Sequence, residues 1–351
     1  MSGKETGNLL KVEDGSLRFH TLIGTGGIGT GSFFLLQGDH TLGREESRGG
    51  KFLDRRDYCK LHILCHYLKS LLGGRFSVLP IGRVGEDEAG ERLIAEMREA
   101  ELDLRYVGTL PRKSTLYSFC FLYPDGSGGN MSTEDSASGE VTAECVATAL
   151  PEFSRAGKRG IALAVPEVPL EAREKLLELG TRYGLFRVAS FASGEMERVR
   201  RSDLLEMVDL LAMNQDEARC LVEIGDGIAG PQAIAGGTIT SLGRRYPHLL
   251  LSVTAGAAGS WSWDGRQLLH VPAIPVPVAT TGGAGDAHLA GIIAGLAADL
   301  SLAIAHRLGV VLAAASVTSP HTIRKGITRW NLADLAIRGN MRDEALLSLF
   351  R

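Results

Sequence analysis

The stretch TTGGAGDAHLAGIIAGLAA, residues 280–298, joins a glycine-rich turn directly to an apolar run of small side chains. The run predicts a helix, and the turn places free backbone N–H groups beside the positive end of the helix dipole. That geometry binds anions. Asp286 falls in the first turn of the predicted helix, where a carboxylate is electrostatically favoured and is able to face an anion held by the turn. Such a carboxylate is suited to deprotonate an alcohol while the N–H groups stabilise a transferring phosphoryl group.

A purely structural interpretation of this stretch stays open. Asp286 could cap a helix, and the glycines could do no more than permit a tight turn. The choice between the two interpretations depends on the rest of the chain.

Three other segments carry spacings typical of a functional site. Asn214-Gln215-Asp216-Glu217 stands at the end of a predicted strand and opens a helix, VTAGAAG at 253–259 joins a strand to a glycine-rich turn, and residues 82–90 read GRVGEDEAG. Together with GGAGD at 282–286, these segments resemble the NxxE, TxGxxG, GxVGxDxxG and DTxGAGD motifs of the PfkB (ribokinase-like) carbohydrate kinase family. Their order and spacing agree with that family.

The resemblance implies a ribokinase-like α/β fold with a central, mostly parallel sheet, flanking helices and a small β-sheet lid. It also implies ATP as phosphoryl donor, with Mg²⁺, and Asp286 as general base. The remaining residues that it implies are Gly283, Ala284 and Gly285 for the anion hole, Asn214 and Glu217 for Mg²⁺ through water, and Thr254, Gly256, Gly259 and Thr318 for the nucleotide.

The N-terminal half departs from the family pattern. The family's first strand leads to an Asp that binds sugar hydroxyls, and the matching position here is Gly29. The GGxxxN substrate motif matches Gly49, Gly50 and Asp54, with Asp54 where Asn is usual. Thr280 replaces the first Asp of DTxGAGD, which puts the family's K⁺ site in doubt. The resemblance therefore implies phosphoryl transfer more firmly than a particular sugar.

Some of these residues also have other interpretations. Asn214 and Glu217 form a capping-box pattern, which is compatible with a role at a metal. The sequence GTGGIG at 24–29 fits GxGxxG after a strand, but no convincing helix or acidic partner follows, so a dinucleotide site is not favoured. His288 is expected to pack rather than to react.

The pattern from residue 160 onward predicts one large α/β domain. Strands at 160–165, 186–191, 209–213 and 249–253 alternate with helices at 170–183 and 216–222, as expected for a mostly parallel sheet with helices on both faces. We expect this domain over 16–340, with lid segments near 25–50 and 105–135 and a loosely ordered lead-in at 1–15.

Composition excludes several classes of protein. The 351 residues carry 38 Lys and Arg against 41 Asp and Glu, without a long block of one sign, which argues against nucleic acid as a partner. The 44% hydrophobic content excludes general disorder. The cysteines show no CxxC pair, no signal peptide is evident, and charged residues interrupt the most apolar stretch. We expect a cytoplasmic protein with reduced thiols and no membrane partner.

The function expected from these observations is ATP-dependent phosphorylation of a hydroxyl, typically a hydroxymethyl group, on a sugar or related small polyol. Two alternatives stay open. One is a nucleoside kinase of the same superfamily, with Phe33, Phe34 and Phe52 as candidates for an apolar acceptor pocket. The other is a non-catalytic, ligand-binding member of the fold. A homodimer formed through the lid is also possible in such a family.

Overall fold

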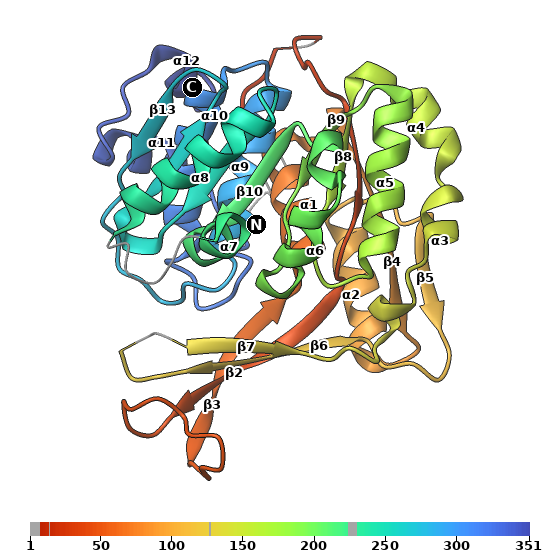
Figure 1. The fold of residues 1–351 in the computed structure, drawn as a ribbon, viewed down its shortest axis with the longest axis vertical. Coiled ribbons are helices and arrows are strands. Elements are labelled where there is room, and N and C mark those ends of the chain that lie inside the picture. Colours follow the sequence, from red (N-terminus) through yellow and green to blue (C-terminus); the bar gives the residue numbers. More distant parts are fainter. Residues whose placement is uncertain (1–7, 14, 126–127, 224–229) are drawn as a thin grey trace, which may run out of the picture.

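The computed structural model describes residues 8–13, 15–125, 128–223 and 230–351. Within these ranges, nine strands form one large sheet and four strands form a separate small sheet (Figure 1). The large sheet contains, in spatial order, β13 (Leu268–Val271), β12 (Ser260–Trp263), β11 (Leu250–Thr254), β10 (Leu210–Asn214), β9 (Phe186–Ala189), β8 (Gly160–Ala164), β1 (Thr21–Thr25), β4 (Ser77–Gly85) and β5 (Tyr106–Leu110). Neighbouring strands pair in parallel from β11 to β5, and β12 pairs antiparallel with both β11 and β13.

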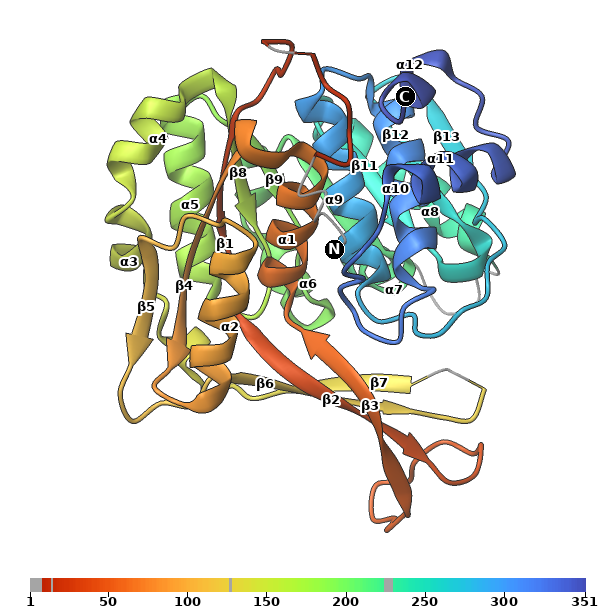
Figure 2. The same ribbon diagram turned by 180° about the vertical axis from the view of Figure 1, so that it is seen from behind.

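Helices cover both faces of the large sheet. Figure 2 shows α1 and α9 on the face opposite to α5 and α8. The helices are α1 (Lys60–Leu72), α2 (Glu88–Glu99), α3 (Ala143–Ala147), α4 (Leu150–Ala156), α5 (Leu170–Tyr183), α6 (Met196–Arg201), α7 (Gln215–Val222), α8 (Pro231–Arg245), α9 (Ala284–Ala297), α10 (Leu302–Ser316), α11 (Arg329–Arg338) and α12 (Glu344–Ser348). Single 3-10 turns are η1 (Gly73–Arg75), η2 (Ala137–Glu140), η3 (Gly157–Arg159), η4 (Ser193–Glu195), η5 (Leu204–Met207) and η6 (Gly256–Ala258).

The core follows the two-residue period of the buried strands. Leu22 of β1 packs into the core on the α1 and α9 face, whereas its neighbour Ile23 packs into the core on the α5 face. Both faces of the strand are therefore apolar, as parallel sheets require. This arrangement confirms the predicted three-layer α/β fold.

The small residues of α9 permit a close approach to α10. A side chain at Gly291 would lie 2.6 Å from the Cα of Gly309 on α10, so only glycine fits there. Residues 287–297 of α9 are all buried. The apolar run that follows GGAGD is therefore a core helix.

The small sheet contains β3 (Gly50–Tyr58), β2 (Gly29–Leu36), β6 (Leu116–Leu122) and β7 (Gly128–Ser132), in this spatial order. It projects from one end of the large sheet (Figure 1). The predicted bounds of the lid, 25–50 and 105–135, differ from those of the small sheet in two places. β3 extends to Tyr58, past the expected limit at 50, and β5 pairs with β4 in the large sheet.

The first described residues are not a loose lead-in. Leu10 is fully buried, and its N–H donates to the carbonyl oxygen of Leu71. The N–H of Lys11 donates to Leu349. Apolar side chains at 9, 10 and 12 explain this packing, because they bury surface against α1. Residues 1–7 and 14 lie outside the described part of the chain.

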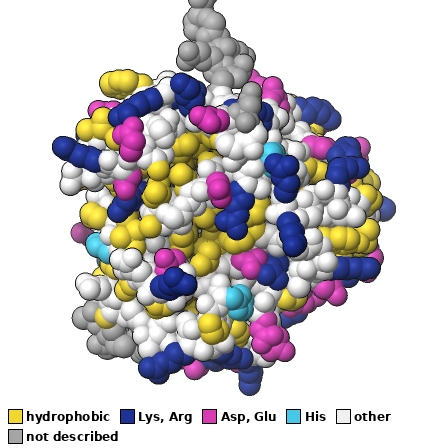
Figure 3. All heavy atoms as spheres, turned by 90° about the horizontal axis from the view of Figure 1, so that it is seen from above, with side chains coloured by type: hydrophobic (Ala, Val, Ile, Leu, Met, Phe, Trp, Pro, Cys, Tyr) yellow, Lys and Arg dark blue, Asp and Glu magenta, His cyan; other side chains and the backbone are white. Residues whose placement is uncertain are grey.

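The surface carries both signs of charge. Figure 3 shows the end of the molecule opposite to the small sheet, where basic and acidic side chains are interspersed. No helix among the described residues is long and apolar enough to cross a membrane.

Candidate active site

The glycine-rich turn before α9 has the geometry of an anion site. Gly283 is the N-cap of α9 and adopts φ +75°, a left-handed conformation that favours glycine. Within the described part of the chain, the N–H groups of Gly283 and Gly285 have no acceptor, so they can bind a negative group. Ala284 differs from the prediction, because its N–H donates to the carbonyl oxygen of Thr281 at 3.3 Å.

The small sheet reaches over this turn. A side chain at Gly282 would lie 3.1 Å from both Phe33 of β2 and Thr322. The hydroxyl of Thr322 accepts a hydrogen bond from the N–H of Tyr58, at the end of β3, at 3.0 Å. A hydrogen bond within the turn joins Thr280 to Gly282, because Oγ1 of Thr280 accepts from the N–H of Gly282 at 3.2 Å. The turn therefore packs against the small sheet through Phe33 and against Thr322.

Asp286 and Lys60 face each other at the start of two helices. Asp286 lies in the first turn of α9 and Lys60 is the first residue of α1, and their Oδ1 and Nζ atoms are 3.7 Å apart. Burial raises the pKa of Asp286, and the Lys60 ammonium acts in the opposite direction. The Asp286 carboxylate, in turn, raises the pKa of Lys60. The Asp286 side chain is 16% exposed, so a ligand can reach it.

Two more carboxylates lie beside this pair. Glu167 follows β8, and its Oε2 accepts from the backbone N–H of Lys60 at 2.9 Å. Burial raises the pKa of Glu167 to about 7, although Lys60 lowers it. Glu167 also has φ +77°, a strained conformation that is typical of functional sites. Burial raises the pKa of Asp57 in β3, and the negative charge of Asp286 adds to this effect.

The NxxE motif lies at the carboxyl end of the neighbouring strands. The Oδ1 atom of Asn214 accepts from the N–H groups of Asp216 and Glu217 at 2.9 and 2.8 Å, and Oε2 of Glu217 accepts from the N–H of Asn214 at 2.9 Å. This is the predicted capping box. Burial raises the pKa of Glu217, and the charges of Lys60 and Asp286 both act on it. Capping thus fixes Glu217 within electrostatic range of Asp286.

Comparison with known proteins identifies the family. The model described as pfkB family carbohydrate kinase matches residues 65–328. The chain belongs to this family. Its members are phosphotransferases, which agrees with a carboxylate beside a turn whose N–H groups are free.

Individual relatives agree with the PfkB assignment. Ribokinase from Lactococcus lactis is 25% identical over 240 residues, which cover 68% of this chain and 72% of that protein. Fructokinase from Klebsiella pneumoniae is 36% identical over 94 residues, which cover 27% of this chain but only 28% of the fructokinase. The structure of ribokinase from Cryptococcus neoformans in complex with ADP has a TM-score of 0.75 at 19% identity, covering 91% of this chain and 99% of that one.

The residues that match the family's nucleotide segment lie next to the NxxE motif. Thr254 at the end of β11 pairs with Asn214 at the end of β10. Gly256 and Gly259 follow with φ +54° and +90°, and a side chain at Gly259 would lie 2.8 Å from the Cα of Pro272. Position 259 therefore accommodates only glycine.

Thr318 follows α10 and faces into its own loop. Its Oγ1 donates to the carbonyl oxygen of Ala315 and accepts from Nη1 of Arg324, both at 2.7 Å. These bonds fix the loop that joins α10 to α11. Thr318 therefore stabilises this loop. Its contact with the nucleotide stays a prediction.

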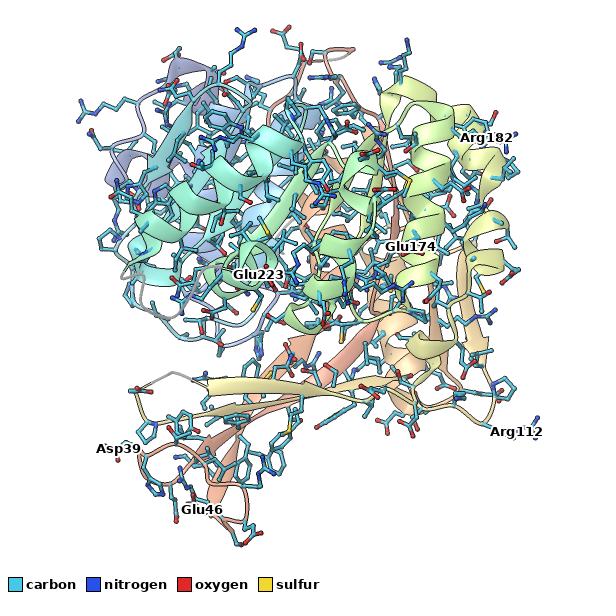
Figure 4. The ribbon with its side chains drawn as sticks, in the orientation of Figure 1. Asp39, Glu46, Arg112, Glu174, Arg182 and Glu223 are labelled. Carbon is cyan, nitrogen blue, oxygen red and sulfur yellow. The ribbon has the colours of Figure 1, made fainter. Side chains whose placement is uncertain are left out.

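The structure does not bring Gly49, Gly50 and Asp54 to the Asp286 turn. Gly50 pairs with Leu36 at the free end of the β2–β3 hairpin, and Figure 4 shows Asp39 and Glu46 in the loop at that end. Eight residues of extended strand, about 26 Å, separate Gly50 from the other end of β3. The acidic side chain of β3 whose pKa is raised by the charge of Asp286 is Asp57, whereas Asp54 is exposed.

Gly29 lies in the site, but without room for a side chain. A Cβ there would lie against the carbonyl oxygen of Leu116, 2.6 Å from Sγ of Cys59 and 2.8 Å from Cβ of Leu116. A Cβ at Gly27 would meet the carboxylate of Glu167. The space next to β1 is therefore filled from β6, from the start of α1 and from Glu167. The family's Asp is therefore absent at a position where the local packing leaves no room for a side chain.

Sequence reasoning missed Lys60, Asp57 and Glu167. Glu167 follows a buried parallel strand, where ligand-binding residues concentrate, and this position was a usable signal. Asp57 and Lys60 carried no such signal, because both residues lie outside the lid segment predicted near 25–50.

Proposed function

We propose that this protein transfers the γ-phosphoryl group of ATP to a hydroxyl, typically a hydroxymethyl group, of a sugar or related small polyol. The observation that carries the proposal is the position of Asp286, whose carboxylate lies in the first turn of α9 beside the free N–H groups of Gly283 and Gly285. The carboxylate takes the proton of the acceptor hydroxyl, and the N–H groups stabilise the negative charge of the transferring phosphoryl group. Membership of the PfkB family supports this assignment.

The acceptor would be held by the carboxylates around Asp286. Asp57 and Glu167 present oxygens that accept hydrogen bonds from hydroxyl groups. Polyols carry several such donors in a row, so a neutral polyhydroxyl compound fits this set. Phe33, which packs over Gly282, would close the site against water, and this reduces hydrolysis of the phosphoryl donor.

Asn214 and Glu217 would hold Mg²⁺ through water. Amide and carboxylate oxygens suit a hard cation that keeps several water ligands. The elevated pKa of Glu217 fits this interpretation, because a buried carboxylate gains from a nearby cation. When bound, Mg²⁺ neutralises charge on the nucleotide phosphates.

We expect Glu217→Gln to raise the Mg²⁺ concentration needed for half-maximal turnover by about tenfold or more. Glutamine retains an oxygen that can accept from the N–H of Asn214, so the capping box survives while the charge is lost. The measurement is turnover against free Mg²⁺ at saturating ATP. Asp216→Asn, an exposed neighbour, serves as control. An unchanged Mg²⁺ dependence in Glu217→Gln would remove Glu217 from the metal site.

The experiment that tests the function is acceptor-dependent ADP release with Mg·ATP over a panel of hexoses, pentoses, sugar acids, polyols and nucleosides. A sugar or polyol that accelerates ADP release supports the proposal. Preference for adenosine over ribose and fructose would favour the nucleoside kinase alternative, for which Phe33 supplies an aromatic wall. ATP binding without turnover on any acceptor would favour the ligand-binding alternative.

The proposal extends to a homodimer formed through the outer face of the small sheet. Phe52 is 64% exposed and Met131 is 55% exposed, and the rings of Phe34, Phe52 and Phe119 contact one another on this face. A contiguous apolar patch of this kind marks an interaction surface. The edge strands of the sheet add unpaired backbone groups.

We expect Phe52→Asp to convert a dimer into a monomer, because it places a charge in the centre of the patch. Sedimentation equilibrium measures the mass in solution. Trp330→Asp is the matched control, since Trp330 is exposed on α11, away from the small sheet. A wild-type protein that sediments as a monomer at all concentrations would contradict the dimer.

A further inference from the structure

The side chain of Lys60 points toward Asp286, although capping of α1 does not require this orientation. Its backbone N–H, at the start of the helix, is already satisfied by Oε2 of Glu167. Its Nζ atom reaches instead to Oδ1 of Asp286, at 3.7 Å. The side chain is 34% exposed, so its ammonium group is not sealed in the core and a bound ligand can contact it.

The ammonium of Lys60 lies among carboxylates from both halves of the site. It interacts electrostatically with Asp286, Glu167 and Glu217. Glu167 stands on the side that we assign to the acceptor, and Glu217 stands on the side of the nucleotide phosphates. Asp286 lies between them. The positive charge of Lys60 is therefore placed close to the path along which a phosphoryl group would move.

Phosphoryl transfer accumulates negative charge on the three equatorial oxygens of the moving group. A lysine ammonium carries three donors and a compact positive charge. It can therefore bond to an oxygen of Asp286 and to a phosphoryl oxygen at the same time. The N–H groups of Gly283 and Gly285 would contact the phosphoryl group from the start of α9, and Lys60 would contact it from the start of α1.

We propose that Lys60 is a second catalytic residue, whose ammonium pairs with Asp286 in the resting protein and donates a hydrogen bond to the phosphoryl group during transfer. This inference rests on the proposed function. In the step, the acceptor O–H proton passes to the Asp286 carboxylate and the acceptor oxygen bonds to the γ-phosphorus. The bond from that phosphorus to the β–γ bridging oxygen breaks, and ADP leaves. Lys60 keeps its protons throughout.

The test compares Lys60→Ala with the wild-type protein, using the best acceptor of the panel. We expect kcat to fall by about 10²-fold or more, as for removal of one charge-stabilising donor, while KM for the acceptor changes much less. Lys60→Arg, which keeps the charge, should recover part of the loss. Lys325→Ala is the matched control, because Lys325 is 48% exposed and pairs with Glu96, at 3.2 Å, instead of with Asp286.

Chemical rescue separates a catalytic ammonium from a structural ion pair. Added ethylammonium should raise the turnover of Lys60→Ala in proportion to its concentration and leave Lys325→Ala unchanged. Lys60→Met preserves the length of the side chain and replaces Lys60→Ala if the latter melts at a lower temperature.

The outcomes distinguish the two proposals. Wild-type protein without turnover on any acceptor overturns the proposed function and the role of Lys60 with it. Wild-type turnover together with a Lys60→Ala or Lys60→Met variant within threefold of the wild-type kcat overturns the role of Lys60 alone. A loss of kcat that Lys60→Arg or ethylammonium restores supports it.

Discussion

We expect Asp286→Asn to lower acceptor-dependent turnover by about 10² to 10⁴. Asparagine has nearly the same shape as aspartate, so the start of α9 and its free N–H groups remain in place. What is lost is a group that can accept a proton from the acceptor hydroxyl. Mg·ATP binding should therefore stay close to the wild-type value, and this split between binding and turnover identifies a general base.

The control for Asp286→Asn is Asp264→Asn. Asp264 is exposed in the turn between β12 and β13, where its Oδ1 accepts from the N–H groups of Arg266 and Gln267. Asp264→Asn makes the same substitution far from Asp286, so this variant should retain full turnover. Turnover of Asp286→Asn within a few fold of the wild-type protein would remove Asp286 from the role of base.

The second large effect is expected from Gly29→Asp, which introduces the residue found at this position in the family. A Cβ at Gly29 would lie 2.6 Å from Sγ of Cys59 and 2.8 Å from Cβ of Leu116, so either β6 or the start of α1 must shift. The new carboxylate would also be buried near Glu167. Overpacking and an unpaired buried charge together should cost about 3 kcal/mol or more.

Thermal unfolding and turnover together test the Gly29 prediction. We expect a lower melting temperature and a loss of acceptor-dependent turnover, because a shift of α1 moves Lys60. Gly194→Asp is the control, since a side chain at Gly194 meets no other atom within 4 Å. A Gly29→Asp protein that melts at the wild-type temperature and phosphorylates its acceptor would show that the site retains the family's sugar subsite.

Much of the fold could be predicted because its signals are local. The apolar run after GGAGD has the composition of a buried helix, and α9 spans Ala284–Ala297 with its N-cap at Gly283. The alternation of strands and helices after residue 160 predicts a parallel sheet, and β8 to β11 do pair in parallel. The capping box at Asn214 is a short-range pattern, and the structure contains both of its hydrogen bonds.

The acceptor side could not be predicted in the same way. Its residues come together through the small sheet, whose strands pair over long sequence separations, as β2 does with β6. The pattern GGxxxN placed Asp54 in the site, but β3 is long enough to carry Gly50 to its free end and to bring Asp57 and Lys60 to Asp286 instead. Packing around Gly29 likewise depends on Leu116, which is distant in the sequence.

The most direct test of the central claim is phosphorus NMR of the protein with Mg·ATP and the best acceptor of the panel. We expect the γ-phosphate resonance of ATP to decrease while a phosphomonoester resonance of the acceptor increases in equal amount, and we expect Asp286→Asn to slow both changes together. Formation of inorganic phosphate in place of the phosphomonoester, or an unchanged ATP spectrum with every acceptor, would contradict phosphoryl transfer by this site.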